Sequence, residues 1–282
     1  MTDLFHKNRN TIRVNLLDPF LRGGMQCAEI GAGPYPQKLP DNVDVVYFDK
    51  RNEEELREYF KTGVSSVLKS VLPVEEMPEY KSSFDVVIAH HVLEHSPNPV
   101  ETLIAWNALL KNGGYMCLSV PDARKCFDRE RLPPSPQHII HDYVFQRSMD
   151  DFESREHIYN FINAWRNDPF FGPLDKNEIA DLAYQSVNSS VNDCHWHAFN
   201  KELLLSVVYF ASYFSGRGVE VKAFFDGEGD KAAQMSNDLI VIYRISENEI
   251  NKGNVDFAHY NQIISDTEKS LMKAIAKFRK RE

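Results

Sequence analysis

The chain has 282 residues, of which 43% are hydrophobic and 26% charged, and this composition excludes a mainly disordered protein. Its net charge of −9 disfavours a nucleic-acid partner, because phosphates would be repelled. The four cysteines are scattered without C-x-x-C spacing, which argues against a disulfide framework and fits a reducing cytosol. The N-terminal residues lack the apolar core of a secretion signal, and no run is long enough to span a bilayer, so we expect a cytoplasmic protein.

Short apolar runs bounded by Gly, Pro, Asn or Asp predict buried strands. Their nearly continuous apolar character favours a parallel sheet that is covered on both faces. The runs are residues 25–30, 43–48, 84–89 and 115–120, and two similar runs follow at 219–225 and 238–245.

Helical patterns separate the strands. The pattern predicts helices at 52–60, 100–110, 137–145, 149–166, 176–187, 201–212 and 257–278. Residues 121–200 are polar, punctuated by proline, and show no strand signal. The alternation of strands and helices therefore predicts a doubly wound α/β sheet with a helical insertion after the fifth strand.

A glycine turn follows the first predicted strand, where residues 29–36 read EIGAGPYP. The third glycine of the dinucleotide fingerprint is replaced by Pro36, and the G-K-[ST] of a P-loop is absent. The second strand ends at Asp49, where a carboxylate is placed to accept both ribose hydroxyls of an adenosine. A purely structural turn and a surface Asp49 are the alternatives. Together the two features predict an adenosine site without a pyrophosphate cradle.

This combination resembles the class I S-adenosylmethionine-dependent methyltransferases. The resemblance extends through residues 82–122, which read SSFDVVIAHHVLEHSPNPVETLIAWNALLKNGGYMCLSVPD, and covers about half of the chain. It implies a Rossmann-like sheet of seven strands whose last pair includes one antiparallel strand. Residues 120–143, 154–157 and 194–199 are similar to methyltransferase-like proteins of bacterial polysaccharide biosynthesis clusters.

The resemblance implies S-adenosylmethionine as the cofactor. Pro34, Pro36 and Pro40 leave room only for a loop where this family has a long helix, and the third strand is not defined by the sequence. Glu75 stands in for the acid that the family places near the adenine. The predicted cofactor-binding residues are Glu29, Gly31, Ala32, Gly33, Asp49, Lys50, Glu75, His90 and His91.

Residues 91–95 read HVLEH, which is also the H-x-x-E-H signature of a group of zinc peptidases. A metal pair would need His91 and His95 on one helix, whereas a predicted strand precedes them and Pro97 and Pro99 follow. The segment is then one turn at most. We expect His95 to support this loop or to face the substrate, and a zinc-dependent hydrolase is the remote alternative.

The insertion is dense in ionisable groups, and a hydroxyl acceptor needs a base. We take His195 or His138 as that base. His195 and His197 alternate along an extended segment, and with His138 or His157 they could form a metal site, but the ligand count is open and no metal is assigned. Arg124 and Arg131 are expected to hold an anionic or sugar-like acceptor. The predicted substrate-binding residues are His95, Arg124, Arg131, Asp142, His157 and His197.

The predicted organisation has three parts. Residues 1–120 form the cofactor-binding half, 121–200 a substrate lid, and 201–282 the completion of the sheet and a C-terminal helix suited to homodimerisation. The predicted function is methyl transfer to oxygen on a small or carbohydrate-linked acceptor. The alternative is a non-catalytic cofactor-binding or scaffold protein of the same fold.

Overall fold

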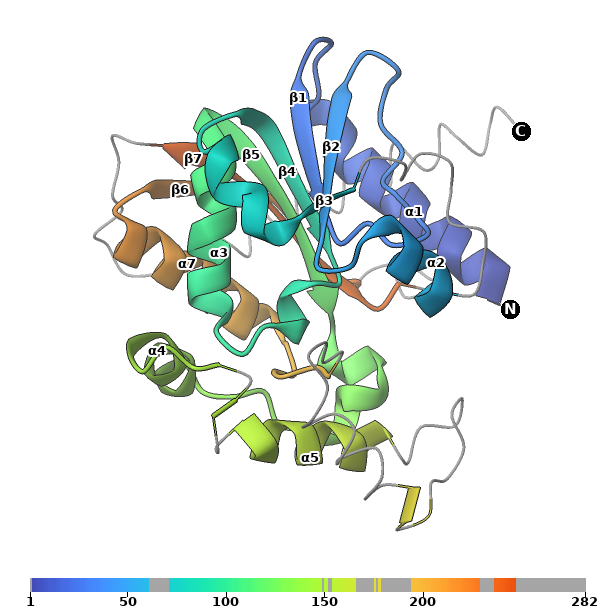
Figure 1. Ribbon diagram of the computed structural model, residues 1–282, viewed down its shortest axis with the longest axis vertical. Coiled ribbons are helices and arrows are strands. Elements are labelled where there is room, and N and C mark those ends of the chain that lie inside the picture. Colours follow the sequence, from blue (N-terminus) through green and yellow to red (C-terminus); the bar gives the residue numbers. More distant parts are fainter. Residues whose placement is uncertain are drawn as a thin grey trace.

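The computed structural model describes residues 2–60, 71–148, 150–151, 154–165, 175, 177–178, 194–228 and 236–246 (Figure 1). Within these residues the strands form one seven-stranded sheet in the order β3-β2-β1-β4-β5-β7-β6. Strands β1 to β5 pair in parallel, and β7 is antiparallel to both of its neighbours, as expected. The strands are β1 (Gln26–Ile30), β2 (Asp44–Asp49), β3 (Val71–Pro73), β4 (Phe84–His90), β5 (Leu110–Pro121), β6 (Gly218–Phe225) and β7 (Asp238–Ser246).

The helices lie in three places. Figure 1 shows α3 and α7 on one face of the sheet, α1 on the other, and α4 and α5 together beyond the end of the strands. This arrangement confirms the doubly wound α/β class and shows that the described part of the insertion is helical. The helices are α1 (Thr2–Leu17), α2 (Glu53–Phe60), α3 (Pro99–Leu109), α4 (Pro136–Val144), α5 (Ser154–Trp165) and α7 (Lys201–Ser215).

Strand β4 shows how the sequence produces two cores. Successive side chains of a strand point to opposite faces of the sheet. Val87 and Ala89 join the cluster that includes residues of α3 and α7. Val86 and Ile88 join the cluster that includes residues of α1. The continuous apolar run at 84–89 is therefore explained by burial on both faces.

Two features differ from the sequence-based expectation. Helix α1 was not predicted, yet its buried residues Ile12, Leu16 and Leu17 cover one face of the sheet. Strand β3 has only three residues, and its pattern was too short to recognise from the sequence. The loop expected from the three prolines is confirmed, because no helix lies between β1 and β2, where every residue is described.

Most predicted elements agree with the structure to within a few residues at their ends. Strand β5 begins at Leu110 rather than at 115, because pairing with β4 extends back past Gly113 and Gly114. The predicted helix at 176–187 lies almost wholly outside the described residues, and that at 257–278 entirely so, together with the proposed dimer surface. No described helix combines the length and hydropathy that a membrane span requires.

Candidate functional site

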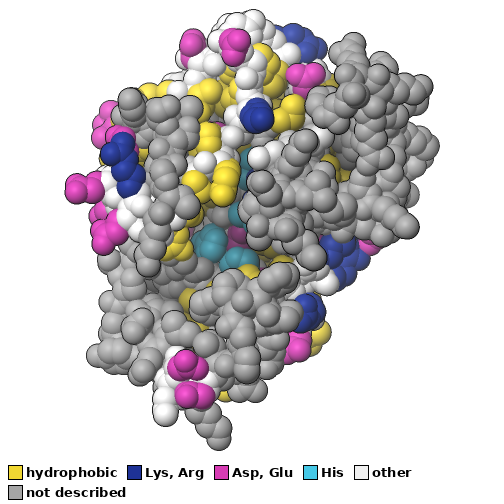
Figure 2. Space-filling model, turned by 90° about the vertical axis from the view of Figure 1, so that its right-hand side faces the viewer, with side chains coloured by type: hydrophobic (Ala, Val, Ile, Leu, Met, Phe, Trp, Pro, Cys, Tyr) yellow, Lys and Arg dark blue, Asp and Glu magenta, His cyan; other side chains and the backbone are white. Residues whose placement is uncertain are grey.

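A cleft of about 520 Å³ opens at the carboxyl ends of β1, β2 and β4. The strand order reverses between the parallel strands β1 and β4, and this switch point is where open α/β sheets bind their ligands. Figure 2 shows histidine side chains near the centre of the face that it displays. The predicted cofactor residues that line the cleft are Glu29, Gly31, Ala32, Gly33, Asp49, Lys50, His90 and His91, and the predicted substrate residue His95 lines it too. Glu75 is exposed on the 3-10 segment Val74–Tyr80 and does not line this cleft.

Gly31 forms the floor of the turn after β1. Its φ is +64°, a conformation that suits glycine, and its backbone N–H donates to the Phe48 carbonyl at 2.8 Å. A Cβ at this position would lie 2.6 Å from Val92 Cγ2. Glycine is therefore required here for both conformation and space, because Val92 packs against the turn.

Glu29 lies at the base of the cleft and is 2% exposed. Both of its carboxylate oxygens accept from the backbone N–H of Gln37, at 2.9 and 3.1 Å. Burial raises the pKa of Glu29 to about 7, although the hydrogen bond from Gln37 and the charge of Arg13 act in the opposite direction. The Glu29 side chain therefore anchors the loop between β1 and β2, whose first residues line the cleft.

Asp49 ends β2 with its side chain in the cleft and is 9% exposed. Its Oδ1 accepts from the backbone N–H of Arg51 at 3.0 Å, and burial raises its pKa. The Arg51 guanidinium lies over the Tyr59 ring, 4.0 Å from the centroid. The carboxylate is thus held by the following turn on the wall of the cleft.

His90 and His91 follow β4 into the cleft. His90 Nε2 donates to Gln37 Oε1 at 3.2 Å, and its Nδ1 is 2.8 Å from Ser119 Oγ, so the orientation of the ring is fixed. Burial, followed by the charge of Arg13, lowers the pKa of His90 well below its ordinary value. His91 has a φ of +56°, which is rare for a residue other than glycine and is common at functional sites.

A buried ion pair beneath the cleft was missed by sequence reasoning. Asp238 at the start of β7 accepts from Arg13 Nε at 2.8 Å and lies 2.7 Å from His91 Nε2. Burial opposes ionisation of Asp238, but the charges of Arg13 and His91 hold its pKa below the ordinary value. The one signal in the sequence is an arginine beside Ile12, Leu16 and Leu17 on an otherwise apolar helix face.

His195 has a carboxylate partner that the sequence did not reveal. Its Nδ1 is 2.6 Å from Asp128 Oδ2, and Arg131 Nη1 donates to Asp128 Oδ1 at 2.7 Å. Burial alone would raise the pKa of Asp128, but the hydrogen bond from His195 and the charge of Arg131 outweigh it and lower this pKa. The ring centroids of His195 and His95 are 5.0 Å apart. The His195–Asp128 pair therefore stands next to a residue of the cleft wall.

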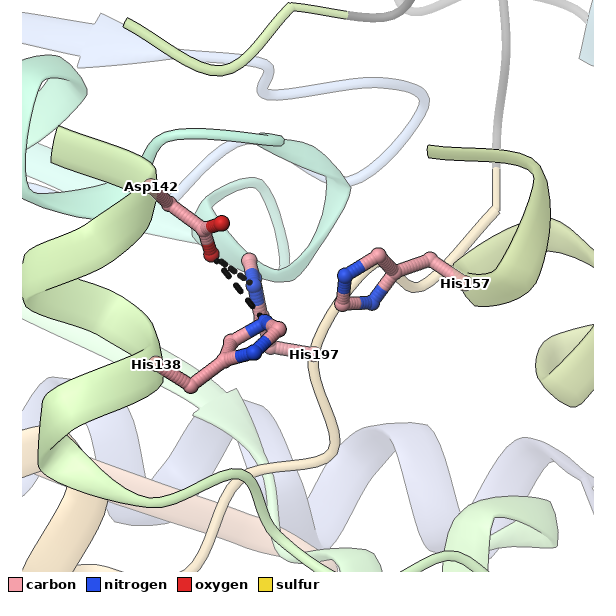
Figure 3. Close-up of side chains that lie close together, drawn as sticks. All are labelled: His138, Asp142, His157 and His197. Atoms are coloured by element: carbon pink, nitrogen blue, oxygen red, sulfur yellow. Dashed lines mark hydrogen bonds and ion pairs between the residues drawn. The ribbon is translucent and has the colours of Figure 1, made fainter. Parts of the chain in front are cut away.

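A second cluster gathers four of the predicted residues, as Figure 3 shows. His138 and Asp142 come from α4, His157 from α5, and His197 from the segment before α7. His138 and His157 also line a separate cavity of about 470 Å³. The two predicted bases, His195 and His138, therefore belong to different clusters.

The two predicted acceptor-binding arginines lie apart. Arg131 lines the 470 Å³ cavity and donates to the His195 and Trp196 carbonyls at 2.8 and 2.9 Å. Arg124 is paired with Asp122 at 2.7 Å and Glu228 at 2.6 Å, and it lines neither cavity. The H-x-x-E-H segment forms a single 3-10 turn, Leu93–His95, so His91 and His95 do not share an α-helix.

Comparisons with known proteins address the family. A family model described as a methyltransferase domain matches residues 15–165. No curated protein matches the sequence. The CurJ carbon methyltransferase is similar with 14% identity and a TM-score of 0.45, over 86% of this chain and 55% of its own. The plantazolicin methyltransferase BamL, solved with S-adenosylhomocysteine, is similar with 12% identity and a TM-score of 0.45, over 86% of each chain. An S-adenosylmethionine-dependent methyltransferase of Thermotoga maritima is similar with 15% identity and a TM-score of 0.44, over 87% of this chain and 92% of its own.

Proposed function

We propose that this chain, which belongs to the methyltransferase-domain family and is an S-adenosylmethionine-dependent methyltransferase, methylates an oxygen atom of a small or carbohydrate-linked acceptor. The observation that supports oxygen as the target is the His195–Asp128 pair beside the cleft. A hydroxyl is a weak nucleophile at neutral pH, so its methylation is accelerated by a base that takes its proton.

The residues of the cleft fit the cofactor. The cleft volume is that of an ordinary small-molecule site, and the backbone of the glycine turn lines it. We assign the ribose hydroxyls to Asp49, the closely approached backbone to the turn 31–33, and the methionine half to His90 and His91. Lys50 and Glu29 complete the wall and the base of this site. When bound, the cofactor supplies a methyl group that its sulfonium already activates.

His195 is the proposed base. Asp128 occupies its Nδ1, so Nε2 is the nitrogen that takes the proton of the acceptor hydroxyl as the oxygen gains the methyl group. Asp128 then stabilises the protonated ring, while Arg131 balances the carboxylate in its resting state. Alignment of the hydroxyl with the methyl–sulfur bond supplies much of the remaining rate.

The helical insertion is the proposed acceptor side of the enzyme. It brings Arg131 and His157 to the wall of the 470 Å³ cavity, which lies next to the segment that carries His195. Arg124 is already bound by two carboxylates, so we assign it to the structure of the insertion rather than to the acceptor.

The experiment that tests this function is transfer of a labelled methyl group from S-adenosylmethionine to a panel of hydroxylated, glycosylated and amine acceptors. We expect a methyl ether as the product, and a decrease in kcat of about a hundredfold or more for His195→Gln. S-adenosylhomocysteine affinity should be unchanged in that variant. The matched control is His141→Gln, an exposed histidine on α4. A methylamine product, or full activity of His195→Gln, would contradict the proposal.

A further inference from the structure

We propose that His138, Asp142, His157 and His197 bind one divalent transition-metal ion of the zinc class. The site lies within the insertion, apart from the cofactor cleft, and its existence does not depend on which atom the enzyme methylates. Each of the four side chains offers one ligand atom, and all of these atoms lie within 4.8 Å of one another. Three imidazoles and one carboxylate form a donor set that suits zinc, cobalt or iron(II).

The spacing around Asp142 is that of metal ligands. Its Oδ2 lies 3.0 Å from His197 Nε2 and 3.2 Å from His138 Nε2 (Figure 3). Metal–ligand bonds of about 2.0–2.1 Å in a tetrahedron separate the ligand atoms by about 3.3–3.4 Å. Two imidazoles that converge on one carboxylate oxygen therefore already sit near the edges of such a tetrahedron. All four ligand atoms lie within 4.8 Å of one another, so small rotations of the imidazoles would bring them to these edges.

His157 is held in the form that a metal ligand needs. Its Nδ1 lies 2.7 Å from the Trp196 carbonyl oxygen, which can only accept a hydrogen bond. The proton of the neutral ring is therefore on Nδ1, and Nε2 keeps its lone pair. A hydrogen bond from the second ring nitrogen to a backbone carbonyl is the usual support for a metal-binding histidine.

Asp142 is also held by a neighbouring group, in this case an arginine. Its side chain is fully buried, and its second oxygen, Oδ1, accepts from Arg147 Nε at 3.4 Å. Oδ2 is thus left to the imidazoles. His197 is also fully buried, and its Nδ1 has no hydrogen-bond partner in the described structure. A carboxylate buried among three imidazoles, with only a long contact to Arg147 among the described residues, is costly unless a cation compensates its charge at Oδ2.

The site has an open side. His138 and His157 line the 470 Å³ cavity, whereas Asp142 and His197 lie behind them and are not exposed. Four protein ligands complete a tetrahedron around the ion. A water molecule, or a hydroxyl or carboxylate group of a ligand in the cavity, would approach from this open side and raise the coordination number to five.

Metal binding by the full-length protein tests this proposal directly. The protein is stripped of metal with a chelator, loaded with Zn²⁺ or Co²⁺, and desalted. Retained metal is then measured by mass spectrometry, and Co²⁺ coordination by visible absorption. We expect one equivalent to survive desalting, with the intense d–d bands of low-coordinate Co²⁺. His138→Gln and His157→Gln should each weaken binding at least tenfold.

Two controls keep the result interpretable. His141→Gln changes a histidine on the same helix that lies outside the cluster, and it should retain full binding. His197→Ala risks unfolding because the residue is buried, so circular dichroism must show that each variant used is folded. Less than a tenth of an equivalent of retained metal would overturn the proposal. Undiminished metal binding by folded His138→Gln and His157→Gln would also overturn it. So would a loss of metal binding in His141→Gln as large as the loss in those two variants.

Discussion

Arg13 of helix α1 donates to Asp238 of strand β7 at 2.8 Å, across 225 positions of sequence and beneath the 520 Å³ cleft. Arg13 is 5% exposed and Asp238 fully buried, so neither charge can be solvated if the other is removed. We expect Arg13→Met to lower the free energy of unfolding by about 3–5 kcal/mol. Arg57→Met, which breaks an exposed pair with Glu53, should cost at most about 1 kcal/mol. Equal losses in urea denaturation of the two variants would contradict this.

Gly31→Ala should damage both the fold and the cleft. The new Cβ would meet Val92 Cγ2 at 2.6 Å on a backbone that already disfavours it. We expect S-adenosylhomocysteine affinity to decrease at least tenfold. Gly216→Ala is the matched control, because its φ is +70° and nothing lies within 4 Å of the added Cβ. It should cost about 1 kcal/mol of stability and leave the affinity unchanged. A normal affinity in Gly31→Ala would show that the turn is not the cofactor floor.

The buried Glu29 makes stability depend on pH. Its pKa is raised from 4.5 to about 7, so the stability it contributes is present below pH 4.5 and lost as pH rises through 7. We expect Glu29→Gln to match the wild type near pH 5, because the Gln oxygen can still accept from Gln37. At pH 8 the variant should be more stable, by up to about 3 kcal/mol. Glu54→Gln on the exposed side of α2 is the control, and urea denaturation at both pH values provides the measurement.

Asp128 Oδ2 lies 2.6 Å from His195 Nδ1, and in the proposed mechanism it positions that base. Asp128→Asn keeps the shape but removes the charge that stabilises the protonated imidazole. We predict a decrease in kcat of about ten- to a hundredfold, with little change in the KM for S-adenosylmethionine. The rate–pH profile should also move, because the base loses its carboxylate partner. A uniform loss of activity at all pH values, with reduced stability, would indicate a purely structural role.

The sequence predicted every strand except β3, because the others are largely apolar runs between turn residues, as in residues 84–89. It also placed Asp49 and Gly31 correctly at the strand ends, since both follow directly from the end of a run. Residues that depend on distant contacts were not found. Asp128 meets His195 across 67 positions and Asp238 meets Arg13 across 225, and no local pattern marks either pair.

The histidines illustrate the same limit. The alternation of His195 and His197 predicted a shared side, yet tertiary contacts assign one to Asp128 and the other to Asp142. The separation of the two clusters is decided by where α4 and α5 pack, which the spacing of residues within each helix does not determine. Glu75 was chosen by analogy with a family pattern, and the short β3 leaves it on the exposed side of the following 3-10 segment.

Asp49→Ala tests the ribose contact. A carboxylate that accepts hydrogen bonds from two hydroxyl groups contributes about 1.5–3 kcal/mol to binding, so the variant should bind S-adenosylhomocysteine about ten- to a hundredfold more weakly. Asp44→Ala is the control on the same strand: Asp44 is exposed at the opposite end of β2 and pairs with Gln26 at 2.8 Å. The Asp44→Ala variant should bind S-adenosylhomocysteine with the affinity of the wild type.

Calorimetric titration of the wild-type protein with S-adenosylhomocysteine is the most direct measurement of the cleft's role. We predict one site per chain with a dissociation constant in the micromolar range or below, and competition by S-adenosylmethionine. No binding heat with several hundred micromolar ligand, confirmed by equilibrium dialysis, would contradict the assignment of the cofactor to the ends of β1, β2 and β4.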